Sequence, residues 1–334
     1  MSLIKCPIST YTDTADFLSL YSHIISLFAL PINLLGIWLI YYKTPIRMKN
    51  MKGVMLNCHV WGLIGDLMLG TLTIPYVFFP LIAGTPLGIL TKLFEVNAFF
   101  QTYIAVACIG EVGSSIVFMF ENRQCQTVTS SFKLSSETSR RTFYTINMVF
   151  PFLASIISLI RIPHQDSAKL EMLKELPCPT MEYYQLPTII VTTDAKTIGF
   201  CLLFILVFYS TQVVFFIAHA SFYLCISTKA YVSAKTKKLK QKYFLAVCIQ
   251  VIIPFTIMVF PVGYFTFSII TDHYDQSLNN FCFLVMSTHG FSATIATVLI
   301  YENYRSEILR VLRLKTDSKV RLIMSKSMAE TTYI

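Results

Sequence analysis

Residues 197–228 read TIGFCLLFILVFYSTQVVFFIAHASFYLCIST and contain no Asp, Glu, Lys or Arg. A helix rises about 1.5 Å per residue, so about 20 apolar residues cross the roughly 30 Å hydrocarbon core of a bilayer. In lipid the backbone has to satisfy its own hydrogen bonds, and a helix does so within one segment. The stretch therefore predicts a membrane-spanning helix.

Six further long stretches contain few or no charged residues. Long intervals between charged residues place the spans at about 18–42, 53–80, 94–120, 142–161, 197–228, 243–270 and 279–302. The composition agrees, because only 13% of the residues are charged and 54% are hydrophobic, whereas a soluble domain carries about 25% charged residues. No linker or internal repeat divides the chain. We predict the all-α class: a single seven-transmembrane helix bundle over residues 1–334.

The positions of Lys and Arg predict the orientation, because basic residues concentrate in cytoplasmic loops. Segments 41–53, 121–141, 228–242 and 303–334 hold 21 of the 27 Lys and Arg residues. This places the N-terminus outside and the C-terminus in the cytoplasm. The net charge of +9 does not indicate a nucleic-acid partner, because the sequence has no solvated domain on which the basic residues cluster. We therefore expect none.

The cytoplasmic tail, 303–334, begins with alternating apolar and basic residues. From Tyr304 to Lys315 this pattern predicts a short amphipathic helix that lies on membrane lipid. The alternative is a basic tail without structure. No phosphate-binding glycine loop, HExxH or GxSxG motif occurs. We therefore expect no enzyme activity, no cofactor and no metal site.

Several short motifs, in order along the chain, carry a resemblance to a known family. They are 31–36 (PINLLG), 74–80 (IPYVFFP), 83–88 (AGTPLG), 121–123 (ENR) and His289-Gly290. Together they resemble the nematode serpentine chemoreceptors of class H, with class I next closest. Rhodopsin-like receptors differ, because the last span reads Thr297-Val298-Leu299-Ile300-Tyr301 and has no Asn-Pro-x-x-Tyr pattern.

This resemblance implies a G-protein-coupled chemosensory receptor. Its partners would be a small-molecule or odorant ligand in the outer half of the bundle and a heterotrimeric G protein at the cytoplasmic face. The implied location is the plasma membrane, as a multi-pass protein, with the sensory cilium of a chemosensory neuron as the family's typical site. Pro254 and Pro261 in the sixth span would give the moving helix its flexible points.

Glu121, Asn122 and Arg123 end the third span and match the family's coupling signature. We expect Arg123 to pair with its neighbouring Glu at rest and to turn toward a G protein on activation, since its donors stay charged. Without the resemblance, a basic residue beside the cytoplasmic surface is ordinary.

Asp66 and Glu111 lie deep within their spans, where an ionisable group needs a partner. Asp66 is predicted to form a polar switch with Asn33, His289 or Thr294, or equally to act as a protonated hydrogen-bonding peg. Glu111 lies about 15 Å from Glu121 along the helix. It either borders the ligand cavity or is a neutral structural group.

Three polar residues near the outer end of the third span are candidate ligand contacts: Asn97, Gln101 and Tyr103. Cys6 and Cys178 are both exterior in the predicted topology, and 176–179 (LPCP) resembles the family's outer loop. We expect a Cys6–Cys178 disulfide, with Cys282 as the alternative partner.

Two other functions remain open at this stage. A proton-coupled transporter would use Asp66 and Glu111 as a relay, although an odd number of spans without a repeat is unusual for one. A ligand-gated channel of seven helices is the other, and insect examples of that type have the opposite orientation.

Overall fold

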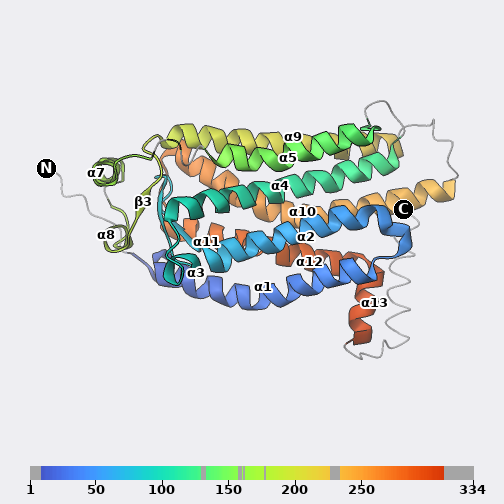
Figure 1. Cartoon of the computed structure of the whole chain (residues 1–334), viewed down its shortest axis with the longest axis horizontal. Helices are drawn as coiled ribbons and strands as arrows, with labels where there is room; N and C mark the ends of the chain where they lie inside the picture. Colours follow the sequence, from blue (N-terminus) through green and yellow to red (C-terminus); the bar gives the residue numbers. More distant parts are fainter. Residues whose placement is uncertain are drawn as a thin grey trace.

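The computed structural model describes residues 9–128, 133–156, 160, 162–176, 178–225 and 234–311. Long helices run side by side along one axis (Figure 1). Small elements gather at one end of the bundle, and α13 (Glu302–Val311) lies across the other end. We call these two ends the sheet end and the α13 end.

Within the described ranges, the bundle consists of seven helical rods. They are α1 (Ala15–Lys43), α2 with the π-helical turn η3 (Lys49–Leu67, Met68–Leu72), α4 (Ala98–Thr127), α5 (Glu137–Ser155), α9 (Ala195–Cys225), α10 (Ala234–Thr271) and the pair α11–α12 (Gln276–Met286, His289–Ile300). Shorter helices are η1 (Tyr11–Asp13), η2 (Ile46–Met48), α3 (Ile89–Lys92), α7 (Gln165–Glu175) and α8 (Glu182–Gln185). The predicted all-α class is confirmed.

Five of these rods are long and apolar enough to cross a membrane, and the pair α11–α12, bent by 45°, would count as a sixth. The remaining rod, α5, ends at Ser155, close to residues 157–159, which lie outside the described ranges. Large apolar side chains face outward from the rods, for example Leu27, which is 72% exposed, and Phe28, which is 62% exposed. Such a continuous apolar exterior is compatible with lipid and not with water.

The second rod differs from the predicted span 53–80. It begins at Lys49, and its helical turns end at Leu72 in η3. Ile74 then takes a φ of 44°, and Pro75 has no N–H to continue a helix. The chain therefore leaves the helical path before 80 and enters a strand.

A three-stranded antiparallel sheet closes the sheet end, and the sequence did not predict it. Its order is β1 (Pro75–Val77), β2 (Ala83–Pro86) and β3 (Ile189–Ile190), with Tyr76 opposite Thr85 and Gly84 opposite Ile189. The sheet joins the loop after the second rod to the segment before α9. It thus forms a lid over that end of the bundle.

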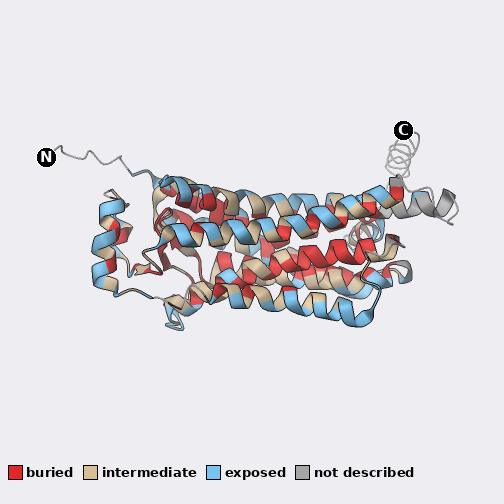
Figure 2. Ribbon diagram, turned by 90° about the horizontal axis from the view of Figure 1, so that it is seen from above, coloured by how far each residue is buried: buried red, intermediate tan, exposed pale blue. Residues whose placement is uncertain are grey.

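Helix α4, the third rod, lies at the centre of the packing. Of its most apolar stretch 67% is buried, against 17% for α9. Figure 2 shows buried residues concentrated on the inward surfaces and exposed residues along the outside of the rods. A central helix that touches most of its neighbours is well placed to connect events at the two ends.

Candidate functional site

A cavity of about 230 Å³ lies under the sheet. Its walls come from η3, the sheet, α4, α5, α9, α10 and α11, represented by Leu69, Thr85, Val106, Ile205 and Phe283. A second cavity, of about 110 Å³, lies deeper between α4, α5, α9 and α10. Val106 and Ile205 line both cavities, so the two adjoin.

The three predicted ligand contacts line neither cavity. Asn97 is the N-cap of α4, where its side-chain oxygen accepts the N–H of Phe99. Gln101 is 1% exposed and donates to Val96 O at 2.8 Å. Tyr103 packs against Phe100, one helical turn earlier, with ring centroids 6.2 Å apart and the rings tilted by 34°. Polar groups at a helix start satisfy the local backbone first, and this explains their positions.

Asp66 is the centre of a buried polar cluster that joins three rods. It is 4% exposed. Its Oδ2 accepts Asn33 Nδ2 of α1 at 2.8 Å, and Thr294 of α12 donates to Asn33 Oδ1 at 3.2 Å. The structure thus brings together three of the residues that the sequence singled out, namely Asp66, Asn33 and Thr294.

The same carboxylate binds the start of α12. Gly290 N donates to Asp66 Oδ1 and Phe291 N donates to Asp66 Oδ2, both at 2.9 Å. The first N–H groups of a helix have no partner within it, and a carboxylate is favoured at that positive end. Asp66 therefore stabilises the break between α11 and α12 from a neighbouring helix. All three of its bonding partners are N–H donors, so Asp66 acts as an acceptor.

The contact between Asp66 and the start of α12 is possible because α2 and α12 approach each other closely. A Cβ added to Gly290 would lie 2.6 Å from Gly62 C of α2. Only glycine lets the two backbones approach so closely. His289 does not bond to Asp66. It is 2% exposed, and neither ring nitrogen has a hydrogen-bond partner among the described residues.

Glu111 lies on α4 and is 1% exposed. It lines neither cavity, and its Oε1 has no hydrogen-bond partner within the described ranges. Cys108, one turn earlier, packs against Met68 and Ala105. Glu111 is thus separate from both the cavities and the Asp66 cluster.

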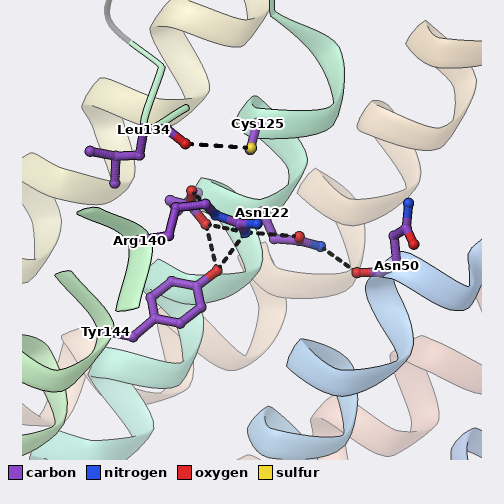
Figure 3. Close-up of polar contacts among 7 residues, drawn as sticks. Asn50, Asn122, Cys125, Leu134, Arg140 and Tyr144 are labelled. Atoms are coloured by element: carbon purple, nitrogen blue, oxygen red, sulfur yellow. Dashed lines mark hydrogen bonds and ion pairs between the residues drawn. The ribbon is translucent and has the colours of Figure 1, made fainter. Parts of the chain in front are cut away.

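At the α13 end, side chains of α5 hold Glu121 of α4; Figure 3 shows two of them, Arg140 and Tyr144, beside Asn122 of α4. Arg140 binds it bidentately, with Nε to Oε1 and Nη2 to Oε2 both at 2.9 Å. Tyr144 OH donates to Oε2 at 2.5 Å. Arg140 also donates to Asn122 Oδ1, and Asn122 Nδ2 donates to Asn50 O of α2 at 3.1 Å. A planar guanidinium is suited to such bidentate binding.

Sequence reasoning did not identify Arg140 and Tyr144 as partners of Glu121, and it had paired Glu121 with Arg123. The spacing of four residues between Arg140 and Tyr144 places both on one face of α5, which was the only available signal. Arg123 is 7% exposed and lies beside this cluster on α4.

Cys178 is disulfide-bonded. Its predicted partner, Cys6, lies outside the described residues, and Cys282, the alternative, is a free and buried thiol. A helix, α13 (Glu302–Val311), covers the first part of the segment Tyr304–Lys315 that was predicted to form an amphipathic helix, and residues 312–334 lie outside the described residues. Lys43 pairs with Glu307 at 2.7 Å and holds α13 against α1.

Comparison with known proteins agrees with this architecture. The family described as serpentine type 7TM GPCR chemoreceptor Srh matches residues 13–314. Serpentine receptor class H-72 of Caenorhabditis elegans is 24% identical over 330 residues, which cover 97% of this chain and 94% of that receptor. The match includes every rod, the sheet and all of α13, so the chain is a membrane protein that belongs to the Srh family of seven-transmembrane serpentine chemoreceptors.

Proposed function

We propose that this protein is a G-protein-coupled chemosensory receptor. A small molecule occupies the cavity under the sheet, which faces the exterior, and a heterotrimeric G protein binds at the α13 end in the cytoplasm. The family membership and the concentration of Lys and Arg at the α13 end support this orientation.

One observation carries the proposal: the broken helix α11–α12 touches both the cavity and the Asp66 cluster. Phe283 and Met286 line the cavity. The helix breaks after Met286, and the first N–H groups of α12 bind Asp66. A ligand that displaces the end of α11 therefore acts directly on the start of α12.

Ligand action follows from differential affinity. A ligand shifts the equilibrium between two arrangements only if it binds one of them more tightly. The buried cluster of α1, α2 and α12 supplies two such arrangements, one with its hydrogen bonds formed and one with them broken, because a hydrogen bond is directional. Pro254 and Pro261 lie inside α10 and give that helix points at which it can bend.

At the cytoplasmic end, we assign the coupling role to Glu121, Asn122 and Arg123. Arg140 and Tyr144 of α5 bind Glu121 of α4. Release of this contact would free the end of α4 while α10 moves outward. Arg123 would then donate to carbonyl groups of the G protein, a task for which its permanent charge and forked donors are suited.

The remaining predicted features are assigned as follows. Glu111 is assigned to a neutral, structural role within α4, Cys6–Cys178 to a covalent tie of the exterior segments, and α13 to a position on the inner leaflet. The plasma membrane of a sensory cell is the proposed location, with the cilium as the place where the protein would meet external chemicals.

The test is a G-protein activation assay in cells that express the full chain. The cells are exposed to pooled volatile and water-soluble metabolites, and Arg123→Ala at equal surface expression is the control. We expect a response that Arg123→Ala abolishes. A ligand-evoked current without nucleotide exchange would favour the channel, and proton-coupled uptake without exchange would favour the transporter.

A further inference from the structure

The described residues that line the two adjoining cavities carry no side-chain charge at neutral pH. Among the described residues that form their walls there is no Asp, Glu, Lys, Arg or His. A charged ligand would lose its hydration there and gain no opposite charge, which is strongly unfavourable. The walls therefore select against organic anions and ammonium ions.

The volume also limits the ligand. The larger cavity measures about 230 Å³ and the adjoining one about 110 Å³. Sites for drug-sized ligands occupy roughly 300–1,000 Å³. The cavity under the sheet thus fits a small molecule, held mainly by contacts with aliphatic and aromatic side chains such as Val106, Ile205 and Phe265.

The hydroxyl groups that line the larger cavity differ in whether they have a hydrogen-bond partner. Thr102 donates to Ala98 O at 3.0 Å, and Thr85 is bonded to Thr188 at 3.2 Å. Thr73 is 3% exposed and lines the cavity, but its Oγ1 has no hydrogen-bond partner among the described residues. Buried polar groups are normally paired, so an unpaired hydroxyl in a cavity wall calls for an explanation.

The backbone around Thr73 is fixed in an unusual conformation. Thr73 N donates to Met68 O at 2.9 Å across the π-helical turn, and Thr73 O accepts Gly88 N at 2.8 Å. The next residue, Ile74, has a φ of 44° although it is β-branched and fully buried. Single π-helical turns and such backbone outliers are concentrated at functional sites. The backbone of Thr73 is thus held in the wall, and rotation about its Cα–Cβ bond changes the direction of its hydroxyl.

We infer that the ligand is an uncharged, mainly apolar small molecule with one hydrogen-bonding oxygen, such as a ketone, aldehyde, ester or alcohol, and that this oxygen bonds to Thr73. This inference rests on the receptor function proposed above, so the experiment that tests it measures ligand binding without any G protein. Affinity comes from apolar burial, and the single hydrogen bond fixes orientation and discriminates against plain hydrocarbons.

Cys201 provides the readout, because it is a free thiol that lines the cavity. The full-length receptor in lipid nanodiscs is treated with an uncharged thiol reagent, and modification of Cys201 is followed by mass spectrometry. The probes share one ring: cyclohexane, cyclohexanone, cyclohexylammonium and cyclohexanecarboxylate. Cys248 on α10, also a free and partly exposed thiol that lines neither cavity, is the internal control.

We expect cyclohexanone to protect Cys201 best, cyclohexane more weakly, and the two ions not at all. Cys248 should react equally in every sample. Protection by either ion at concentrations similar to cyclohexanone would overturn the inference. Failure of all four probes to protect would do the same, since an apolar cavity of this size should admit a neutral ring.

Thr73→Val tests the hydrogen bond, because valine keeps the shape and lacks the hydroxyl. Loss of one neutral hydrogen bond corresponds to about tenfold weaker protection by cyclohexanone, with no change for cyclohexane. Thr102→Val, whose hydroxyl is already bonded to its own helix, is the matched control and should leave both probes unchanged. Thr73→Ser keeps the hydroxyl and should restore binding.

A purely structural role of Thr73 predicts a different result. If the hydroxyl stabilised the fold, Thr73→Val would lower the thermal stability of the empty receptor, whereas removal of an unpaired hydroxyl should leave it unchanged or raise it. Equal affinity of Thr73→Val and wild type for cyclohexanone would refute the assignment. A receptor that binds cyclohexanone as expected and activates no G protein would contradict only the proposed function.

Discussion

Replacement of Asp66 should destabilise the bundle in a graded way. In Asp66→Ala, two buried donors, Asn33 Nδ2 and Gly290 N, and one partly buried donor, Phe291 N, lose their acceptor. Each unpaired buried donor costs about 1–3 kcal/mol, so the upper range is about 3–9 kcal/mol. The true loss is smaller than a simple total, because neighbouring groups relax together.

Asp66→Asn should lie between wild type and Asp66→Ala. Two of the three donors bond to Oδ2 and one, Gly290 N, bonds to Oδ1. The amide can place its oxygen at the Oδ2 position and keep two acceptor contacts, while its NH₂ then faces the N–H of Gly290. Loss of one hydrogen bond to a charged group predicts a destabilisation of about 1.5–3 kcal/mol.

Thermal exposure of buried thiols measures this series. The receptor in detergent is heated with a thiol-reactive fluorophore, which reports Cys58, Cys108 and Cys282, all of them free and buried. Glu137→Gln is the matched carboxylate-to-amide control, because that side chain is 79% exposed and its ion pair with Arg141 lies on the surface. Equal melting of wild type and Asp66→Ala would refute the proposed support of α12 by this carboxylate.

Three further predictions follow from contacts elsewhere in the bundle. Glu121→Gln removes a buried charge from its bidentate contact with Arg140, so basal nucleotide exchange without ligand should rise roughly tenfold; unchanged exchange would contradict the restraining role. Gly290→Ala places a Cβ 2.6 Å from the backbone of α2 and should destabilise the receptor by about 1–3 kcal/mol. The control Gly53→Ala, whose added Cβ would have nothing within 4 Å, should be neutral or stabilising by up to about 1 kcal/mol. Thermal exposure of the buried thiols compares the two variants. Burial raises the pKa of Asp13, but hydrogen bonds from two hydroxyl side chains and two backbone N–H groups outweigh burial and hold that pKa below its ordinary 3.8. The stability from Asp13 is therefore present above about pH 3.8 and lost as the pH falls through the lower folded value; Asp13→Asn should lose less stability on acidification than wild type, and equal losses would contradict this.

The rods and the polar cluster were within reach of the sequence for one physical reason. Lipid removes water as a partner, so long uncharged stretches become helices and the few polar groups inside them have to meet. Asn33 and Thr294 were identified beside Asp66 because few other polar groups are available at that depth. The contact of Asp66 with the N–H groups of Gly290 and Phe291 could not be predicted, since it depends on where α11 and α12 break.

The cavity was beyond sequence reasoning for the opposite reason. Its walls are apolar residues such as Val106 and Ile205, which look in sequence like residues that face lipid. Polar residues drew the prediction to Asn97 and Gln101, which satisfy the start of α4 instead. Likewise, nothing in the sequence sets the register of α5 against α4, so Arg140 could not be assigned to Glu121.

Ligand-driven nucleotide exchange by the purified full-length receptor in lipid vesicles, with a heterotrimeric G protein, tests the receptor function most directly. The comparison is with Ala105→Phe, which adds a ring where Ala105 of α4 lines the larger cavity. We predict that an activating ligand accelerates exchange on wild type and has no effect on Ala105→Phe that folds and melts normally. Equal acceleration by both proteins would contradict the assignment of the cavity, and a ligand that binds wild type without accelerating exchange on any G protein would contradict the receptor function itself.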